Sequence, residues 1–160
     1  MKRINSKPLV IDDEIPDVMG RTDEGTPISL VDFKGRNLAV FFLGAVFDRT
    51  EMTLVKSIKR RIDEFLEFDC SPIVVSMEAD DVLGSVREGE SLPFLMVSDR
   101  SGGIHASVAG GATDQSLGAW LVNDESRIVS AIHPMPPREL VSATVAALAR
   151  VVERSPERES

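Results

Sequence analysis

The stretch Leu38-Ala-Val-Phe-Phe-Leu-Gly-Ala-Val-Phe-Asp-Arg-Thr-Glu51 decides the fold. Its beginning, Leu38 to Leu43, is continuously apolar, which is typical of a central strand covered on both faces of a sheet. After a short loop, apolar residues recur at helical spacing, at Met52, Val55, Ile58 or Lys59, Ile62 and Phe65. The stretch therefore predicts a buried strand, a loop and the start of an amphipathic helix, with Lys56, Arg60 and Asp63 on the solvent side.

Strand and helix patterns alternate on both sides of this stretch. Before it, the turn sequence Asp23-Glu-Gly25 separates two short apolar segments and predicts an N-terminal hairpin. After it, the patterns predict a strand at 72–77, a helix at 80–88 that ends at Gly89, a strand at 94–97, a hairpin of 119–122 with 127–132, and a final helix from Leu140 to Val151. Strands that alternate with helices imply parallel crossovers, and the last hairpin adds antiparallel strands. We therefore expect an α/β fold of thioredoxin-like type, a mixed central sheet with helices on both faces.

Composition limits the class of protein. A chain of 160 residues suits one domain, and we expect an N-terminal arm at 1–14, a folded domain at 15–152 and a disordered tail at 153–160. The formal charge of −8 argues against a nucleic-acid partner, because phosphate binding needs clustered Lys and Arg. No apolar run suits a membrane span or a signal peptide. A single cysteine forms no internal disulfide, so we expect a cytoplasmic protein.

Several segments together resemble the framework of the peroxiredoxins, specifically the alkyl hydroperoxide reductase and thiol-specific antioxidant type. These segments are Ile15-Pro-Asp-Val18, Gly25-Thr-Pro-Ile-Ser-Leu-Val-Asp-Phe-Lys-Gly35, Arg61-Ile-Asp-Glu-Phe65, Ser91-Leu-Pro-Phe-Leu-Met-Val-Ser-Asp99 and Trp120-Leu-Val-Asn-Asp-Glu-Ser-Arg-Ile128. The resemblance implies a peroxiredoxin-type fold with its N-terminal hairpin, peroxide reduction by a cysteine thiolate, and a homodimer.

The resemblance fails at the residues that would carry this chemistry. The family has Pro-x-x-x-Thr-x-x-Cys in the loop before the first long helix, and an arginine just before the strand that contains Trp120. Here Gly44, Asp48 and Glu51 stand at the three loop positions, and Ser116-Leu117-Gly118 stands where the arginine is expected. A carboxylate forms no equivalent of the sulfenic acid. We therefore expect no thiol-dependent peroxide reduction at Glu51.

The remaining candidate groups indicate little chemistry. Cys70 enters a strand instead of starting a helix and has no evident activating neighbour, so an inert thiol is expected. A one-cysteine peroxidase that uses Cys70 is the least favoured alternative. His105 and His133 stand apart from any Cys or carboxylate cluster, so we expect no metal site, and no motif indicates a cofactor.

Glu51 has a structural interpretation and a functional one. Asp48-Arg-Thr-Glu51 has the spacing of a capping box, which would satisfy backbone N–H groups at the helix start. Alternatively, the former peroxide pocket binds a small ligand or a partner, and this is the function we expect. Its expected walls are Gly44, Phe42, Phe47, Phe94, Leu117 and Trp120.

A third alternative is a repurposed, cofactor-independent enzyme. Glu51, with Asp48 or Arg49, would then perform acid–base chemistry on a small organic substrate. The helix start favours the carboxylate by less than one pKa unit, whereas desolvation in a closed pocket raises a carboxyl pKa by up to ~3–5 units. The degree of burial of Glu51 therefore decides between a proton donor and a surface anion.

Overall fold

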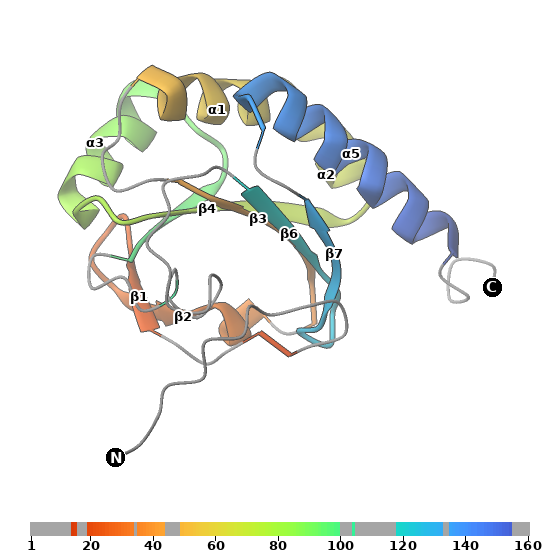
Figure 1. Ribbon diagram of the computed structural model, residues 1–160. Helices are drawn as coiled ribbons and strands as arrows, with labels where there is room; N and C mark the ends of the chain where they lie inside the picture. The colour runs from red at the N-terminus through yellow and green to blue at the C-terminus, as the bar shows by residue number, and fades with distance from the viewer. Residues whose placement is uncertain are drawn as a thin grey trace, which may run out of the picture.

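A mixed β-sheet with a layer of helices along one side forms the body of the molecule in this computed structural model (Figure 1). The structure describes residues 14–15, 19–33, 35–43, 49–99, 104, 118–132 and 135–154. The strands are β1 (Met19–Thr22), β2 (Pro27–Ser29), β3 (Asn37–Phe42), β4 (Cys70–Ser76), β5 (Leu95–Ser98), β6 (Gly118–Val122) and β7 (Ile128–Ile132). The helices are α1 (Arg49–Arg60), α2 (Ile62–Glu67), α3 (Asp80–Glu90), α5 (Pro137–Arg154) and the 3-10 helix η1 (Leu30–Phe33).

The strands lie in the order β2-β1-β5-β4-β3-β6-β7. β3, β4 and β5 are parallel, whereas the two hairpins and the β1–β5 and β3–β6 pairs are antiparallel. The parallel strands are joined through α1 with α2 and through α3, as crossover connections require. The predicted order of elements and the mixed sheet are therefore confirmed, including the N-terminal hairpin and the antiparallel closing hairpin.

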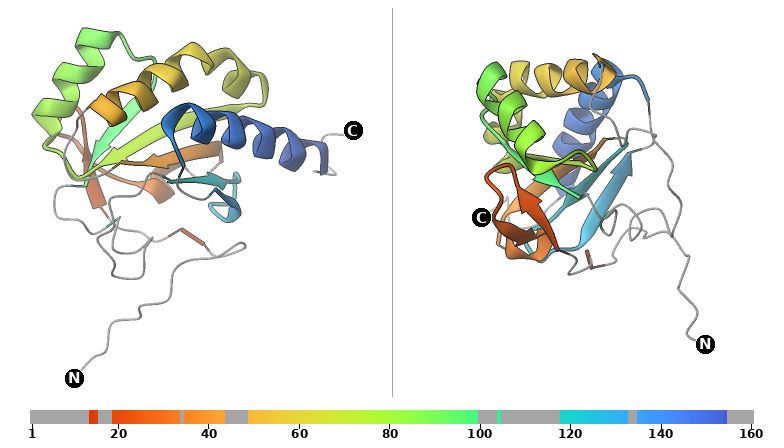
Figure 2. Two further views of the ribbon diagram at one scale, coloured as in Figure 1. Left: turned by 45° about the horizontal axis from the view of Figure 1, so that its top comes forward. Right: turned by 90° about the vertical axis from the view of Figure 1, so that its left-hand side faces the viewer.

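The continuously apolar strand is buried on both faces, as its sequence predicts. Ala39 and Phe41 belong to one apolar cluster, shared with Leu54 of α1. Val40 and Phe42, which point the opposite way, belong to a second cluster. The first cluster lies under α1, α3 and α5, which both views of Figure 2 place along one side of the sheet. The second cluster includes Leu30 of η1, Ile15 and Ile104.

The first long helix differs from its prediction. A break at Arg61 separates α1 from α2, and Arg61 has φ −110° and ψ 20°. Its guanidinium donates to the Glu64 carboxylate at 2.7 Å and to the hydroxyl of Ser142 in α5 at 2.7 Å. The side chain therefore has partners on both sides of the break. The predicted stripe is otherwise confirmed, with Val55 and Phe65 buried.

Two helix ends also lie beyond the residues that the sequence indicates. Gly89 lies inside α3, which ends at Glu90, and its C-cap Ser91 adopts a left-handed φ of 52°. The Ser91 and Leu92 N–H groups donate to carbonyls of the last turn, which closes the helix without a glycine. α5 continues through Arg154, into the segment expected to be a tail. Residues 155–160 and the arm at 1–13 lie outside the described residues.

Candidate functional site

Glu51 lies in the first turn of α1 and is buried, with 6% of its surface exposed. Leu54, Val55 and Ile58 follow it at helical spacing and are fully buried. Because residues three, four and seven apart share one helix face, Glu51 extends the apolar stripe that packs on the sheet. Arg49, by contrast, is exposed. The carboxyl group therefore faces the body of the protein, and Arg49 faces solvent.

The first turn of α1 follows the carboxyl end of β3, where the ends of β4 and β5 also lie. Ser76 and Ser98 pair with each other at this edge of the sheet. Open α/β sheets bind their ligands at the carboxyl ends of the parallel strands. Gly118 pairs with Phe42 at the same edge. It is the last residue of Ser116-Leu117-Gly118, the segment in which the resemblance expects an arginine, and as a glycine it places no side chain at the site. Gly44, Phe47, Asp48 and Leu117 lie outside the described residues.

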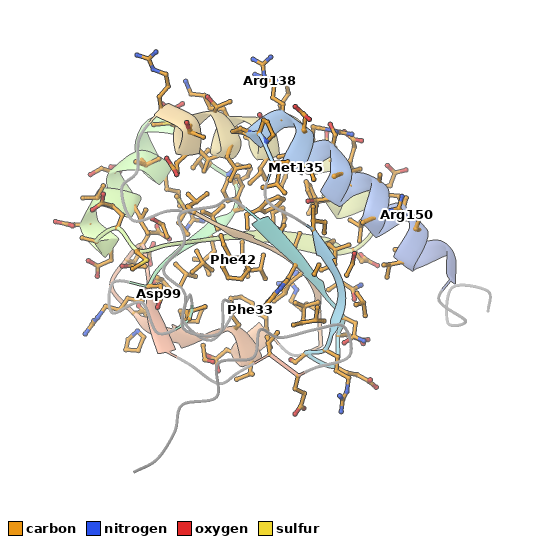
Figure 3. The ribbon with its side chains drawn as sticks, in the orientation of Figure 1. Phe33, Phe42, Asp99, Met135, Arg138 and Arg150 are labelled. Carbon is orange, nitrogen blue, oxygen red and sulfur yellow. The ribbon has the colours of Figure 1, made fainter. Side chains whose placement is uncertain are left out.

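Two of the three described aromatic wall residues lie together. The Phe42 and Trp120 rings meet edge to face, with centroids 5.1 Å apart and an interplanar angle of 80°. Both are buried in the cluster on the side of the sheet away from α1, where Figure 3 also shows Phe33. Phe94 is buried in the other cluster, which also contains Leu83 of α3. The structure therefore brings Phe42 and Trp120 together and places Phe94 on the opposite side of the sheet.

Cys70 lies at the other end of the parallel strands. It pairs with Asn37, the first residue of β3, whereas Val75 pairs with Phe42 at the carboxyl end. At ~3.3 Å per residue, the strand separates Cys70 from Val75 by about 16 Å. The side chain is 1% exposed, and burial raises the pKa of the thiol from 9.0 to about 12. The thiol therefore carries no significant thiolate near neutral pH.

A buried polar group at the carboxyl edge was missed by sequence reasoning. Asp99 directly follows β5, is fully buried, and its carboxylate accepts the Ile104 N–H at 2.9 Å. The Asp99 N–H donates to the carbonyl of Ser76 at 2.6 Å. Figure 3 shows Asp99 toward the β1 end of the molecule. Polar residues directly after two apolar strands, as in Ser76 and Ser98-Asp99, are the signal that could have identified this group. These two hydrogen bonds join the residue that follows β5 to the end of β4 and to Ile104.

Two further classes of site concern metal binding and membrane crossing within the described ranges. There, no group of three or more His, Cys, Asp or Glu side chains could hold a metal ion. His105 and His133 fall outside these ranges. Among the helices that the structure describes, none combines the length and the apolar character that a bilayer crossing requires.

The sheet order, the helix layer and the helix α1 that follows β3 along the chain match the thioredoxin-like scaffold of the peroxiredoxins. The sequence matches the AhpC/TSA family over residues 11–130, so the chain belongs to that family. Peroxiredoxin Bcp of Bacillus subtilis (strain 168) is 27% identical over 91 residues, which cover 57% of this chain and 58% of that protein. The expected membership of the peroxiredoxin family is therefore confirmed.

Solved structures confirm the fold. Peroxidoxin BcpB from Mycobacterium tuberculosis superposes with a TM-score of 0.79 at 16% identity, covering 91% of this chain and 98% of the other. The bacterioferritin comigratory protein of Xanthomonas campestris gives 0.79 at 17% identity, covering 89% and 99%. The thiol peroxidase from Chromobacterium violaceum gives 0.76 at 14% identity, covering 94% and 90%. At these identities the likeness shows the fold alone.

Proposed function

We propose that this AhpC/TSA-family protein carries out no thiol peroxidase chemistry and that the site beside Glu51 binds a small ligand or a partner. The observation that carries the proposal is the position of the only cysteine. Cys70 is buried at the amino end of the parallel strands, whereas the first turn of α1 lies beyond their carboxyl end.

The chemistry of peroxide reduction supports the first half of the proposal. A peroxidatic group must be a thiolate that a peroxide can reach, and it must pass through a sulfenic acid. Cys70 is 1% exposed and burial raises the pKa of its thiol to about 12, whereas Glu51 has no sulfur. The relatives are named for peroxide reduction. This chain keeps their scaffold but has no cysteine in the first turn of α1.

A peroxidase assay tests this half. With hydrogen peroxide or an organic hydroperoxide and a thiol reductant, we expect turnover no faster than that of the Cys70→Ser variant. Turnover that is clearly above the reductant alone and that Cys70→Ser abolishes would refute the proposal. Cys70→Ala, measured in parallel, distinguishes loss of the sulfur from an effect of a buried hydroxyl.

The burial of Glu51 supports the second half. Glu51 is 6% exposed and continues the buried face of α1 at the carboxyl edge of the sheet. A buried acid at the ligand-binding edge of the fold is suited to a ligand or partner that offers a hydrogen-bond donor or a positive charge. The aromatic pair Phe42 and Trp120 closes the opposite face of the sheet near this edge.

Native mass spectrometry tests for the ligand. We expect the purified protein to carry a small molecule that denaturation releases, and we expect Glu51→Gln to lose it while keeping its fold. The matched control Arg49→Gln changes an exposed residue of the same turn and should retain the molecule. If the wild-type protein carries nothing and Glu51→Gln lowers only the stability, helix capping is the whole role of Glu51.

A second candidate is acid–base catalysis by Glu51, with Asp48 or Arg49. The 6% exposure of Glu51 favours it, because a carboxyl group shielded from bulk water can exchange a proton directly with a bound substrate. The test uses the molecule identified by native mass spectrometry. Catalysis requires that the wild-type protein converts it and that Glu51→Gln binds it without turnover, whereas a binding protein leaves it unchanged.

We also propose that the chain forms a homodimer in the cytoplasm. The family resemblance supports the dimer, and β2 and β7, which end the sheet in the described residues, are the strands whose edges a second copy could extend. Sedimentation velocity tests this, since a monomer at all concentrations would contradict it.

A further inference from the structure

A cleft of about 340 Å³ lies at the amino end of the parallel strands, on the opposite edge of the sheet from Glu51. Three connections line it: the segment that leads into β3, the turn between α2 and β4, and the loop between β6 and β7. Its volume is at the lower end of the range of small-molecule sites. We refer to it as the amino-edge cleft.

The walls of the amino-edge cleft are held together by backbone contacts. The Gly35 N–H donates to the carbonyl of Asp124 at 2.7 Å, which joins the first connection to the third. Asn37 pairs with Cys70, which joins the first to the second. The Asp69 N–H donates to the carbonyl of Leu66 at 3.0 Å and closes the turn itself. The cleft is therefore preformed by the fold.

Three charged residues line the cleft. They are Arg36, Asp69 and Asp124, one from each connection. In the described part of the chain, none of the three takes part in an ion pair within 4.0 Å. One cationic and two anionic groups around a single small cleft remain available to a ligand that carries both signs of charge.

The remaining lining residues add an apolar surface and further hydrogen-bonding groups. Leu66 is 56% exposed, a high value for a large apolar side chain. Asn37 and Ser71 contribute an amide and a hydroxyl group. A ligand that fits this lining is small, has a cation and an anion close together, and carries an apolar group.

We propose that the amino-edge cleft binds a free α-amino acid. Its carboxylate is held by Arg36, its ammonium group lies between Asp69 and Asp124, and its side chain packs on Leu66. The site is separate from the one beside Glu51, so this proposal goes beyond the proposed function and stands or falls independently of it. Because its charged groups are exposed, we expect weak binding, with a Kd of about 1 mM.

An NMR titration with L-leucine tests the proposal. In ¹⁵N-labelled wild-type protein, we expect saturable shifts of the Arg36, Asn37, Ser71 and Asp124 amides. L-leucine amide lacks the carboxylate and N-acetyl-L-leucine lacks the ammonium group, so each should bind about fivefold more weakly or worse. Equal binding of all three compounds would overturn the proposal, as would the absence of saturable shifts at these amides up to about 20 mM L-leucine.

Matched variants locate the effect. Arg36→Met and Asp124→Asn each remove one charge from the cleft and should weaken L-leucine binding about fivefold. Glu125→Gln changes the neighbouring loop residue, and Arg60→Met changes an exposed arginine on α1; neither residue lines the cleft, so both variants should bind normally. Equal weakening by the cleft variants and the control variants would show a general charge effect and would overturn the assignment.

Discussion

Because the thiol of Cys70 is buried, the free energy of unfolding falls as the pH rises in the alkaline range. Burial raises its pKa from 9.0 to about 12, so the folded chain keeps the thiol proton at pH values where the unfolded chain loses it. The contribution of the thiol is therefore fully present below about pH 9 and is lost as pH rises from about 9 to about 12. At ~1.4 kcal/mol per pH unit, the thiol lowers the free energy of unfolding by about 1.4 kcal/mol at pH 10, and by about 4 kcal/mol at pH 12.

The assay compares urea unfolding of the wild-type protein and Cys70→Ala at several pH values between about 7 and about 10. Cys70→Ala loses packing at every pH but has no thiol to titrate. The chain contains no tyrosine, and the lysines that titrate in this range are common to both proteins. We expect the stability difference between the two proteins to shrink by about 1.4 kcal/mol toward pH 10. A difference that stays constant with pH would refute the assigned burial and pKa of Cys70.

Three further substitution tests concern the scaffold and the site. Gly84→Ala should destabilise the protein by about 1–3 kcal/mol, because a Cβ there would lie 2.8 Å from the Asp23 carbonyl oxygen. Gly89→Ala in the same helix meets open space and should stabilise the protein by up to ~1 kcal/mol. Urea unfolding of both variants checks this, and equal effects would contradict the close approach of α3 to the β1–β2 turn. Phe42→Ala should cost about 3–5 kcal/mol, and a double-mutant cycle with Trp120→Ala should give a coupling energy of about 0.5–1.5 kcal/mol, whereas strict additivity would mean that the rings do not interact. Glu51→Gln should change the free energy of unfolding by no more than about 1 kcal/mol, a typical capping contribution; a loss of several kcal/mol in thermal or urea unfolding would assign a mainly structural role to the carboxylate.

The architecture was predictable because the sequence signals for it are strong and local. The continuous apolar run from Leu38 to Leu43 is typical of a strand buried on both faces, and that strand is central in the sheet. Asp23-Glu-Gly25 predicts the hairpin, since Gly25 adopts the positive φ of 86° that favours glycine. The break at Arg61 was not predictable, because the apolar stripe continues past it and the contact with Ser142 depends on how α5 packs.

The candidate site was predictable only in part. Helical spacing correctly places Glu51 in the first turn of α1 and in line with buried residues. The position of Phe94 relative to Phe42 was not predictable, since the side of the sheet on which a residue before a strand packs depends on tertiary contacts. The structural role of Asp99 was not predictable from the sequence. It depends on a contact with Ser76, which is distant in sequence, and on a contact with Ile104, which lies outside regular strand pairing.

The central claim is that this scaffold has a carboxyl group where its relatives' chemistry needs a reactive thiol. Mass spectrometry of the native protein after a brief treatment with dilute hydrogen peroxide at neutral pH tests it most directly. The account predicts that Cys70 remains a reduced thiol in the native protein and becomes reactive only after unfolding. Rapid formation of a sulfenic acid at Cys70 in the folded protein would contradict the account.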